Sequence, residues 1–300
     1  MEYKVVTSDK VRLDKYLTSI IDESRSSIIK RIKDEKVLVN GKVAKSSLVL
    51  KNDDVIKLLP YEEPSMDVVP TKMDLDIVYE DDYLMVINKP SGLTVHPGAG
   101  NYQNTLVNGL MYYTKNLSDA SGSERLGIVH RIDKDTSGLM IVCKDNKVHE
   151  LLAEGFKNKT IKRDYLALLV GEFPHASATI NAPIGRDPNN RKMYTVTDQN
   201  SKDAITEMFV VKRYVGYTLV RCSLKTGRTH QIRVHMKYIG YPLYNDPVYN
   251  NKNATSFGQF LHSCHLEFNH PVTHEFLSFD APLPNEFQSF IDNLEEITKI

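Results

Sequence analysis

The chain has 300 residues, and its 38 lysines and arginines balance 38 aspartates and glutamates, so it carries no net charge. No apolar run approaches the roughly 20 residues that a membrane-spanning helix needs, and the start lacks the apolar core of a signal peptide. Its three cysteines are far apart and odd in number, which argues against a disulfide framework. We therefore expect a soluble cytoplasmic protein of about two domains.

The first 60 residues predict a small α+β domain. Apolar residues at helical spacing predict a helix over 13–21, and Ser24 is the expected cap of a second helix. That second helix is expected to direct inward the side chains of Ile28, Ile29 and Ile32. Asn40-Gly41 between two apolar runs is typical of a β-hairpin with a primed turn, and residues 55–58 predict a closing strand.

Positive charge gathers on the second helix and the hairpin of this module. Residues 25–45 contain seven basic side chains and two acidic ones, an imbalance that favours RNA binding over an ordinary solvated surface. We expect RNA contacts from Arg25, Lys30, Arg31, Lys33 and Lys42. Residues 12–58 also resemble the small RNA-binding domain shared by a small-subunit ribosomal protein and tyrosyl-tRNA synthetases.

A linker and a larger domain follow the module. Prolines among acidic residues predict a linker over 61–74. In residues 75–300, turn-rich loops separate the strands expected over 84–87, 128–129, 139–142, 165–170 and 218–224. Helices are expected near 105–113 and after Asn146, a plausible cap. Many strands with few regular strand–helix alternations predict an α+β catalytic domain with a largely antiparallel, mixed sheet.

The segment His-Arg-Ile-Asp-Lys-Asp-Thr-Ser-Gly-Leu, residues 130–139, is a polar loop between two strand-like runs. An aspartate in such a loop is most often structural, because it bonds nearby backbone amides. However, a basic, acid-free segment over 225–235 supplies arginines that need anionic partners. We expect a short helix over 229–237, a pair between Arg233 and Asp133 that keeps the carboxylate ionised, and an Arg228 that faces RNA.

Two further groups of side chains invite a functional interpretation. Tyr165 is either a core residue or a stacking partner for a nucleobase. No common zinc-ligand spacing is matched by His262, Cys264, His265 and His270, so we expect no metal. The sequence also contains no Walker loop and no dinucleotide fingerprint.

Five segments together resemble the RluA-type pseudouridine synthases, in particular the branch that acts on large-subunit ribosomal RNA and carries an N-terminal RNA-binding module. They are residues 88–97, 130–139, 162–171, 226–235 and 261–266. The resemblance implies an isomerase that flips a uridine out of RNA, cleaves its glycosidic bond and re-forms the link at carbon five. Such an isomerisation implies no cofactor, and we expect a monomer with RNA, not a membrane, as its partner.

The resemblance also implies roles for individual residues. It makes Asp133 the catalytic aspartate, Tyr165 the active-site tyrosine and Arg233 the arginine that pairs with the aspartate. Arg131 corresponds to the residue that fills the space left by the flipped base, and Leu261 to an apolar wall of the uracil pocket. His130 and Arg228 are expected to bind substrate beside them. Asp133 either attacks the anomeric carbon or acts as a base that forms a glycal.

Two other functions fit parts of the sequence. A catalytically inactive RNA-binding or ribosome-assembly factor would use the same scaffold, although the catalytic residues are intact. A glycosidase would use Asp133 and Asp135, which requires two carboxyl groups roughly 5–10 Å apart at one sugar. The basic module has no purpose in the glycosidase hypothesis.

Overall fold

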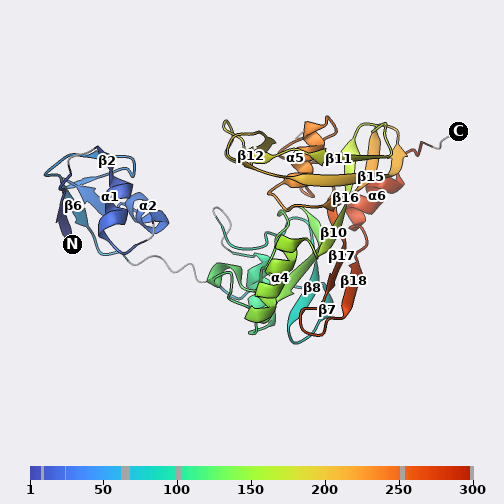
Figure 1. The fold of residues 1–300 in the computed structure, drawn as a ribbon, viewed down its shortest axis with the longest axis horizontal. Helices are drawn as coiled ribbons and strands as arrows, with labels where there is room; N and C mark the ends of the chain where they lie inside the picture. Colours follow the sequence, from blue (N-terminus) through green and yellow to red (C-terminus); the bar gives the residue numbers. More distant parts are fainter. Residues whose placement is uncertain (8–9, 24, 62–67, 99–102, 251–253, 298–300) are drawn as a thin grey trace. The chain divides into compact units, whose positions relative to one another are not determined.

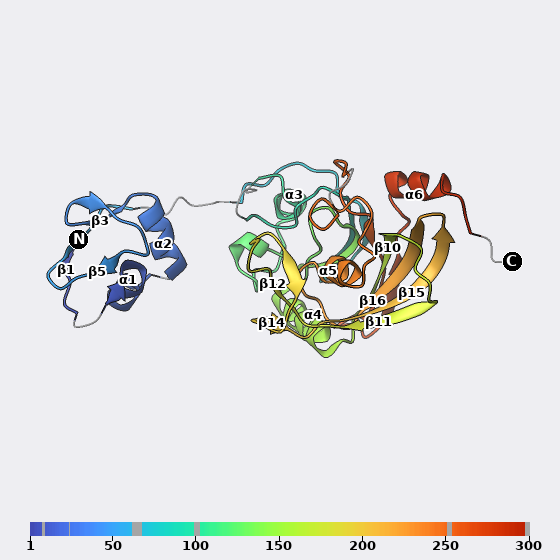
Figure 2. The ribbon, with the colours of Figure 1, turned by 90° about the horizontal axis from the view of Figure 1, so that it is seen from above.

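The computed structural model describes residues 1–7, 10–23, 25–61, 68–98, 103–250 and 254–297. The chain divides into two compact units, Met1–Asp67 and Val68–Ile300, and each is described by itself (Figures 1 and 2). Both units combine helices with mostly antiparallel strands, so the predicted α+β class is confirmed. Among the described residues, no helix is long and apolar enough to cross a membrane.

The first unit packs two helices against a four-stranded sheet of order β1-β6-β3-β4, beside a short β2-β5 ladder. Its elements are β1 (Glu2–Lys4), β2 (Val11–Arg12), α1 (Leu13–Ile20), α2 (Arg25–Lys33), β3 (Val37–Val39), β4 (Lys42–Val43), β5 (Val49–Leu50) and β6 (Val55–Leu58). Leu17 and Ile28 are fully buried in its core. Ile29, which we expected to face inward, is 40% exposed, because a short helix buries only one stripe of its surface.

The predicted hairpin lies between β3 and β4. Asn40 and Gly41 have positive φ angles of 51° and 76°, the conformation of a primed turn, which these two residue types adopt at low cost. The two predicted helices are also present. Ser24, the expected cap of α2, lies outside the described residues.

The second unit is built on a nine-stranded sheet of order β11-β15-β16-β10-β17-β9-β8-β7, with β18 paired to β17. Only the β17–β9 pair is parallel among the pairs described. The strands are β7 (Ile77–Glu80), β8 (Leu84–Lys89), β9 (Ser137–Cys143), β10 (Lys162–Val170), β11 (Ser177–Asn181), β12 (Ile184–Arg186), β13 (Tyr194–Val196), β14 (Ser201–Lys202), β15 (Ile205–Tyr214), β16 (Tyr217–Leu224), β17 (Leu261–Asn269) and β18 (Phe276–Asp280). The α-helices are α3 (Leu106–Tyr113), α4 (Asn146–Asn158), α5 (Gln231–Tyr238) and α6 (Asn285–Asp292), and β12, β13 and β14 form a small separate sheet.

Strand β9 shows how the helices are distributed over the large sheet. All seven of its residues are buried. Met140 and Val142 share a core with α3 and α5, whereas Leu139 and Ile141 share a second core with α4. Because successive side chains on a strand point to opposite faces, α3 and α5 cover one face and α4 covers the other. Helix α4 contacts β9, α5 contacts β13 and β15, and Figure 1 shows the two helices toward opposite ends of the sheet.

Three local expectations differ from the structure. Residues 128–129 contribute a single bridge, from Ile128 to Val142, and no strand. The cap of α4 is Asp145, whose carboxylate accepts from the Val148 amide at 2.9 Å, and not Asn146. Val68 lies within the expected 61–74 linker, but its side chain is buried in the core of the second unit. The second unit therefore begins at residue 68 and not at residue 75.

The close approach of β9 to β17 depends on Gly138. Its φ angle is +111°, and a Cβ atom there would lie 2.3 Å from the backbone oxygen of Ser263. Only glycine fits both the conformation and the contact. This position fixes where the polar loop that precedes β9 meets β17.

Gly138→Ala should therefore destabilise the second unit by more than about 3 kcal/mol, because a backbone clash adds to conformational strain. Gly216→Ala is the matched control, since Gly216 also has a positive φ, +78°, but nothing within 4 Å of the added atom. It should cost only about 1–2 kcal/mol. Urea unfolding measures both, and equal losses would show that the β9–β17 contact is not the constraint.

Candidate active site

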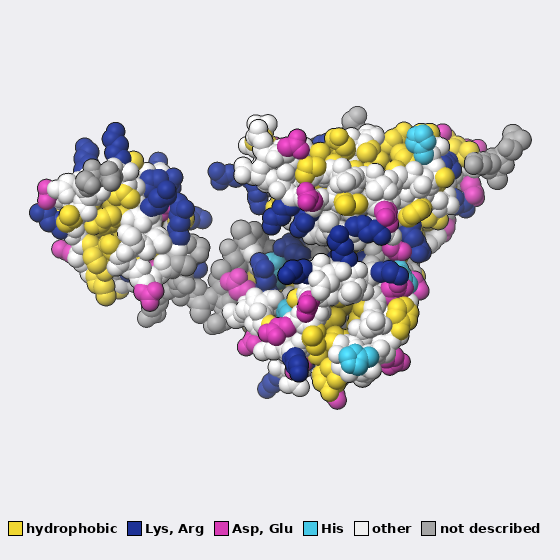
Figure 3. Space-filling view, viewed as in Figure 1, with side chains coloured by type: hydrophobic (Ala, Val, Ile, Leu, Met, Phe, Trp, Pro, Cys, Tyr) yellow, Lys and Arg dark blue, Asp and Glu magenta, His cyan; other side chains and the backbone are white. Residues whose placement is uncertain are grey.

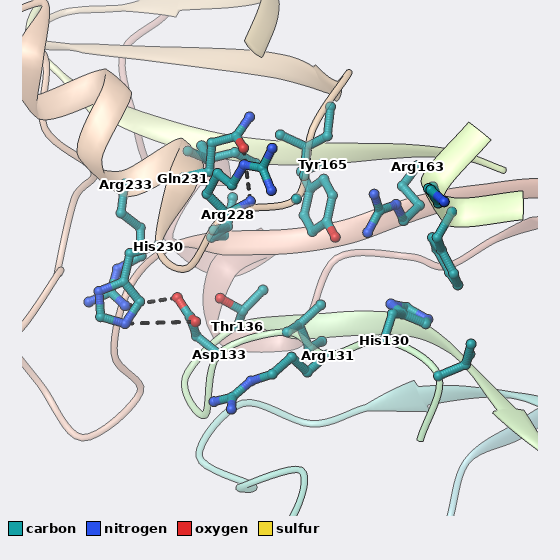
Figure 4. A pocket seen from close by; sticks show the side chains of 18 residues that line it. His130, Arg131, Asp133, Thr136, Arg163, Tyr165, Arg228, His230, Gln231 and Arg233 are labelled. Carbon is teal, nitrogen blue, oxygen red and sulfur yellow. Dashed lines mark hydrogen bonds and ion pairs between the residues drawn. The ribbon is translucent and has the colours of Figure 1, made fainter. Parts of the chain in front are cut away.

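A cavity of about 390 Å³ opens at the centre of the large sheet (Figure 4). It is bounded by the loop before β9, the end of α4, β10, the start of β17 and the segment from Leu224 into α5. Its volume lies in the range of small-ligand sites. It is lined, among others, by all seven residues expected in catalysis or substrate binding: His130, Arg131, Asp133, Tyr165, Arg228, Arg233 and Leu261.

Arg233 joins two carboxylates that are far apart in the sequence. Its Nη1 donates to Oδ2 of Asp133 at 2.8 Å, while its Nε and Nη2 donate to the two oxygens of Asp246 at 2.7 and 2.9 Å. Asp246 is fully buried and Arg233 is 4% exposed. The Arg233–Asp133 pair is the one expected from the sequence, whereas Asp246 was not foreseen.

The charges of this triad stabilise one another. Burial opposes ionisation, but the bidentate hydrogen bonds with Asp246 raise the pKa of Arg233 above its ordinary value. Burial likewise opposes ionisation of Asp246, and the Arg233 guanidinium together with the amides of Val248 and Tyr249 lowers its pKa. Two carboxylates around one guanidinium leave the triad with a net negative charge. Asp133 is the more exposed of the two carboxylates, with a side chain 19% exposed.

The second oxygen of Asp133 faces His230. Its Oδ1 lies 3.8 Å from Nε2 of His230, and Figure 4 shows the imidazole and the Arg233 guanidinium approaching the carboxylate from the same side. His230 lines the cavity but was not singled out from the sequence. Nothing in the sequence around Thr229, His230 and Gln231 indicates that the imidazole lies close to Asp133.

Hydrogen bonds to backbone carbonyl oxygens and to the Thr136 hydroxyl hold the loop that carries Asp133. The ammonium of Lys89, 1% exposed, donates to the carbonyl oxygens of Pro90, Leu93 and Lys134 at 2.8, 2.9 and 2.8 Å. Gln259 donates to Oγ1 of Thr136 at 2.9 Å. The loop is thus attached to two separate segments of the unit.

Asp135 does not belong to the cavity wall. Burial raises the pKa of its carboxyl group, and it packs against Gly258, where a Cβ atom would lie 2.4 Å from the Cβ of Asp135. Asp133 is the one carboxylate among the described residues that line the cavity. The glycosidase hypothesis, which requires two carboxylates at one sugar, therefore lacks its second group.

Another part of the cavity wall combines the apolar side chains of Tyr165 and Leu261 with the polar groups of His130 and Arg163. Tyr165 is 4% exposed, burial raises the pKa of its phenol, and Leu261 is 5% exposed. His130 accepts from the Ile141 amide through Nε2, and burial lowers the pKa of its imidazole to about 3, so it is neutral with its proton on Nδ1. Within the described chain, His130 Nδ1 and Arg163 Nε are buried without a hydrogen-bond partner. Both residues line the cavity.

Cations surround the entrance of this cavity. Figure 3 shows lysine and arginine side chains gathered around a hollow of the second unit. Arg131, Lys157, Arg163 and Arg228 belong to its lining. Arg131 is exposed, and its Nη1 donates to Nε2 of His96 at 2.9 Å. The rim is thus positive around a negative centre.

In the first unit, two of the five expected RNA-binding residues have structural partners. Arg25 donates to the buried carboxylate of Asp14 at 2.6 Å. Arg31 is paired with Glu23 and donates to the carbonyl oxygen of Leu59 at 2.9 Å, so it is only 13% exposed. In the described part of this unit no ion pair involves Lys30, Lys33 or Lys42.

Comparisons with known proteins find similar sequences of one enzyme family. The RNA pseudouridylate synthase family matches residues 83–238, and the S4 domain family matches residues 11–56. The chain is 46% identical to the RNA pseudouridine synthase YlyB of Bacillus subtilis, over 95% of this chain and 94% of that protein. It is 42% identical to ribosomal large subunit pseudouridine synthase D of Neisseria meningitidis serogroup B, over 94% and 78%.

Among solved structures, human RNA pseudouridylate synthase domain containing 1 shares the fold, with a TM-score of 0.61 and 24% identity. The alignment covers 80% of this chain and 93% of the human one.

Lys89 makes stability depend on pH. Burial lowers its pKa from 10.5 to about 7, so between these values the unfolded chain binds more protons than the folded one. The free energy of unfolding should therefore rise from pH 7 to pH 9, with about 2 kcal/mol of the rise due to Lys89.

Urea unfolding of Lys89→Met at both pH values should lack this part of the rise. Lys147→Met, at an exposed lysine, should retain it. The same rise in both variants would show that Lys89 keeps its proton throughout this range.

Proposed function

Since the chain belongs to the RNA pseudouridylate synthase family, we propose that it isomerises specific uridines of large-subunit ribosomal RNA, with Asp133 as the reacting carboxylate. The observation that carries this proposal is the Asp133–Arg233–Asp246 triad in the wall of the cavity. It supplies one ionised carboxylate, held by a buried guanidinium, in a site that otherwise has apolar walls and unused donors. The preference for large-subunit RNA rests on the name of the Neisseria relative.

The reaction makes specific demands on these residues. The bond between N1 of uracil and C1′ of the sugar breaks, and a bond between C5 and C1′ forms. C5 then loses its proton and N1 gains one, so atoms balance without a second substrate. Asp133 acts on the sugar, either at C1′ as a nucleophile or at C2′ as a base. In both routes Asp133 reacts as a carboxylate anion, and the Arg233 guanidinium donates to its Oδ2 at 2.8 Å.

The uracil ring occupies the apolar part of the cavity in this proposal. Tyr165 and Leu261 form two of its walls. The uracil carbonyl oxygens are acceptors for the unpartnered donors on His130 and Arg163. A ring that rotates between cleavage and re-attachment is favoured by apolar walls with a few donors, because these confine it without fixing one orientation.

Extracting the uridine from its stack costs a few kcal/mol. We assign Arg131 to the space that the base leaves, since its side chain is exposed at the rim and anchored to His96 at one end. Lys157 and Arg228 on the same rim provide phosphate contacts. The S4 domain adds lysines that contact the RNA backbone.

The catalytic proposal is tested by release of tritium from RNA labelled at C5 of uridine. Asp133→Asn, which conserves shape, should reduce release to background while RNA binding is retained. Asp135→Asn should release tritium at a rate close to wild type, because Asp135 does not line the cavity. Loss in both variants would favour a two-carboxylate mechanism, and release by Asp133→Asn would exclude Asp133 as the reacting group.

The same assay with separate transcripts tests the substrate. Release is expected from large-subunit ribosomal RNA and not from small-subunit ribosomal RNA or transfer RNA. Release from transfer RNA alone would overturn the substrate part of the proposal and leave the role of Asp133 intact.

The S4 domain is tested by the combined variant K30Q/K33Q/K42Q. It should weaken RNA binding and reduce the slope of log affinity against log salt concentration by about 2, with little change in the single-turnover rate. The control K4Q/K57Q removes two lysines of the same unit that are paired with Asp53 and Glu2. An equal effect of the control would show that net charge matters and the position of the lysines does not.

A further inference from the structure

His230 occupies a strained position at the start of α5. Its φ and ψ angles, 57° and 20°, lie in the left-handed region, which is uncommon for a residue other than glycine. Such strain persists where the surrounding structure imposes it, and it is often found at functional sites. The side chain lies between the active site and Tyr249: Nε2 is 3.8 Å from Oδ1 of Asp133, and Nδ1 is 2.9 Å from the Tyr249 hydroxyl.

The hydrogen bonds of Tyr249 determine which nitrogen of His230 carries the proton. The Tyr249 oxygen accepts from the Tyr194 amide at 2.9 Å, and burial raises the pKa of the phenol to about 12, so its own proton is present. Among the described residues, His230 Nδ1 is the acceptor available to that proton. Burial lowers the pKa of the imidazole below its ordinary value, so the ring is neutral near pH 7. Its proton therefore resides on Nε2 and faces Asp133.

Tyr249 itself is held by the charges of the triad. Its amide donates to Oδ1 of Asp246 at 2.9 Å, and the Arg233 guanidinium lies 5.1 Å from the centre of its ring. Asp246 thus supports Asp133 by two routes: through Arg233 to Oδ2, and through Tyr249 and His230 to Oδ1.

We propose that His230 is a positioning residue for Asp133, whose Nε2–H faces the carboxylate oxygen that Arg233 leaves free. At 3.8 Å the contact is not a hydrogen bond, so Oδ1 keeps its lone pairs for the sugar. The N–H dipole still opposes rotation of the carboxylate and favours its charge. This role rests on the proposed function, because it acts through the reaction of Asp133.

His230→Asn is the decisive variant. Asparagine adopts the left-handed conformation at low cost, and its shorter amide can still bond the Tyr249 hydroxyl, but it cannot reach Asp133. We expect kcat to fall by about 10- to 100-fold, with KM within about two-fold of wild type and an unchanged melting temperature. His230→Gln, whose amide nitrogen can take the place of Nε2, should recover part of kcat. An unchanged kcat, or a rise in KM alone, would overturn the proposal.

Nitrogen-15 NMR of the histidine rings in the free protein tests the tautomer without activity. The His230 signals, identified by their loss in His230→Asn, should show a proton on Nε2 and none on Nδ1. Tyr249→Phe should reduce this preference because the donor to Nδ1 is removed. A proton on Nδ1 in the wild type would overturn the proposal. A wild type with the expected tautomer that forms no pseudouridine in any RNA would instead overturn the proposed function.

Discussion

The buried guanidinium of Arg233 is the constraint on which the site depends. Removing an ion from water costs several kcal/mol, and this cost is offset only when oppositely charged partners satisfy the group. Asp246 satisfies two of its donors from a neighbouring segment, and Asp133 satisfies another from 100 residues earlier in the chain. The need to neutralise one arginine thereby draws the loop before β9 to the start of α5, and it brings together the two parts of the sheet that bound the cavity.

The remaining contacts of that loop have a different character. Lys89, Ser91 and Gln259 bond its carbonyl oxygens and the Thr136 hydroxyl, and none of them touches the Asp133 carboxylate. These groups therefore fix the position of the loop without contacting the carboxylate oxygens, and Arg233 supplies the opposite charge. This separation allows a single carboxylate to be held rigidly while one of its oxygens stays available.

Much of this site could be predicted because its residues lie in local motifs with unusual charge. The loop at 130–139 has a carboxylate between apolar runs, and the segment at 225–235 has arginines and no acidic residues. An ion pair between the two segments satisfies both charges, and it could therefore be predicted. Asp246 was not predictable in the same way, since an aspartate between Asn245 and Pro247 has the pattern of an ordinary turn. The carboxylate partners of Arg25 and Arg31 were not predictable for a related reason, because a charge count does not reveal which cations form ion pairs within the domain.

The distribution of charge in the site resolves a conflict that an RNA substrate creates. The triad is negative overall, and so is every phosphate that must approach Asp133. Cations at the rim, including Arg131 and Arg228, offset this repulsion, whereas Tyr165 and Leu261 form an apolar part of the cavity wall. In the proposed function, a negative centre within a positive rim thus separates the binding of RNA from the chemistry on its sugar.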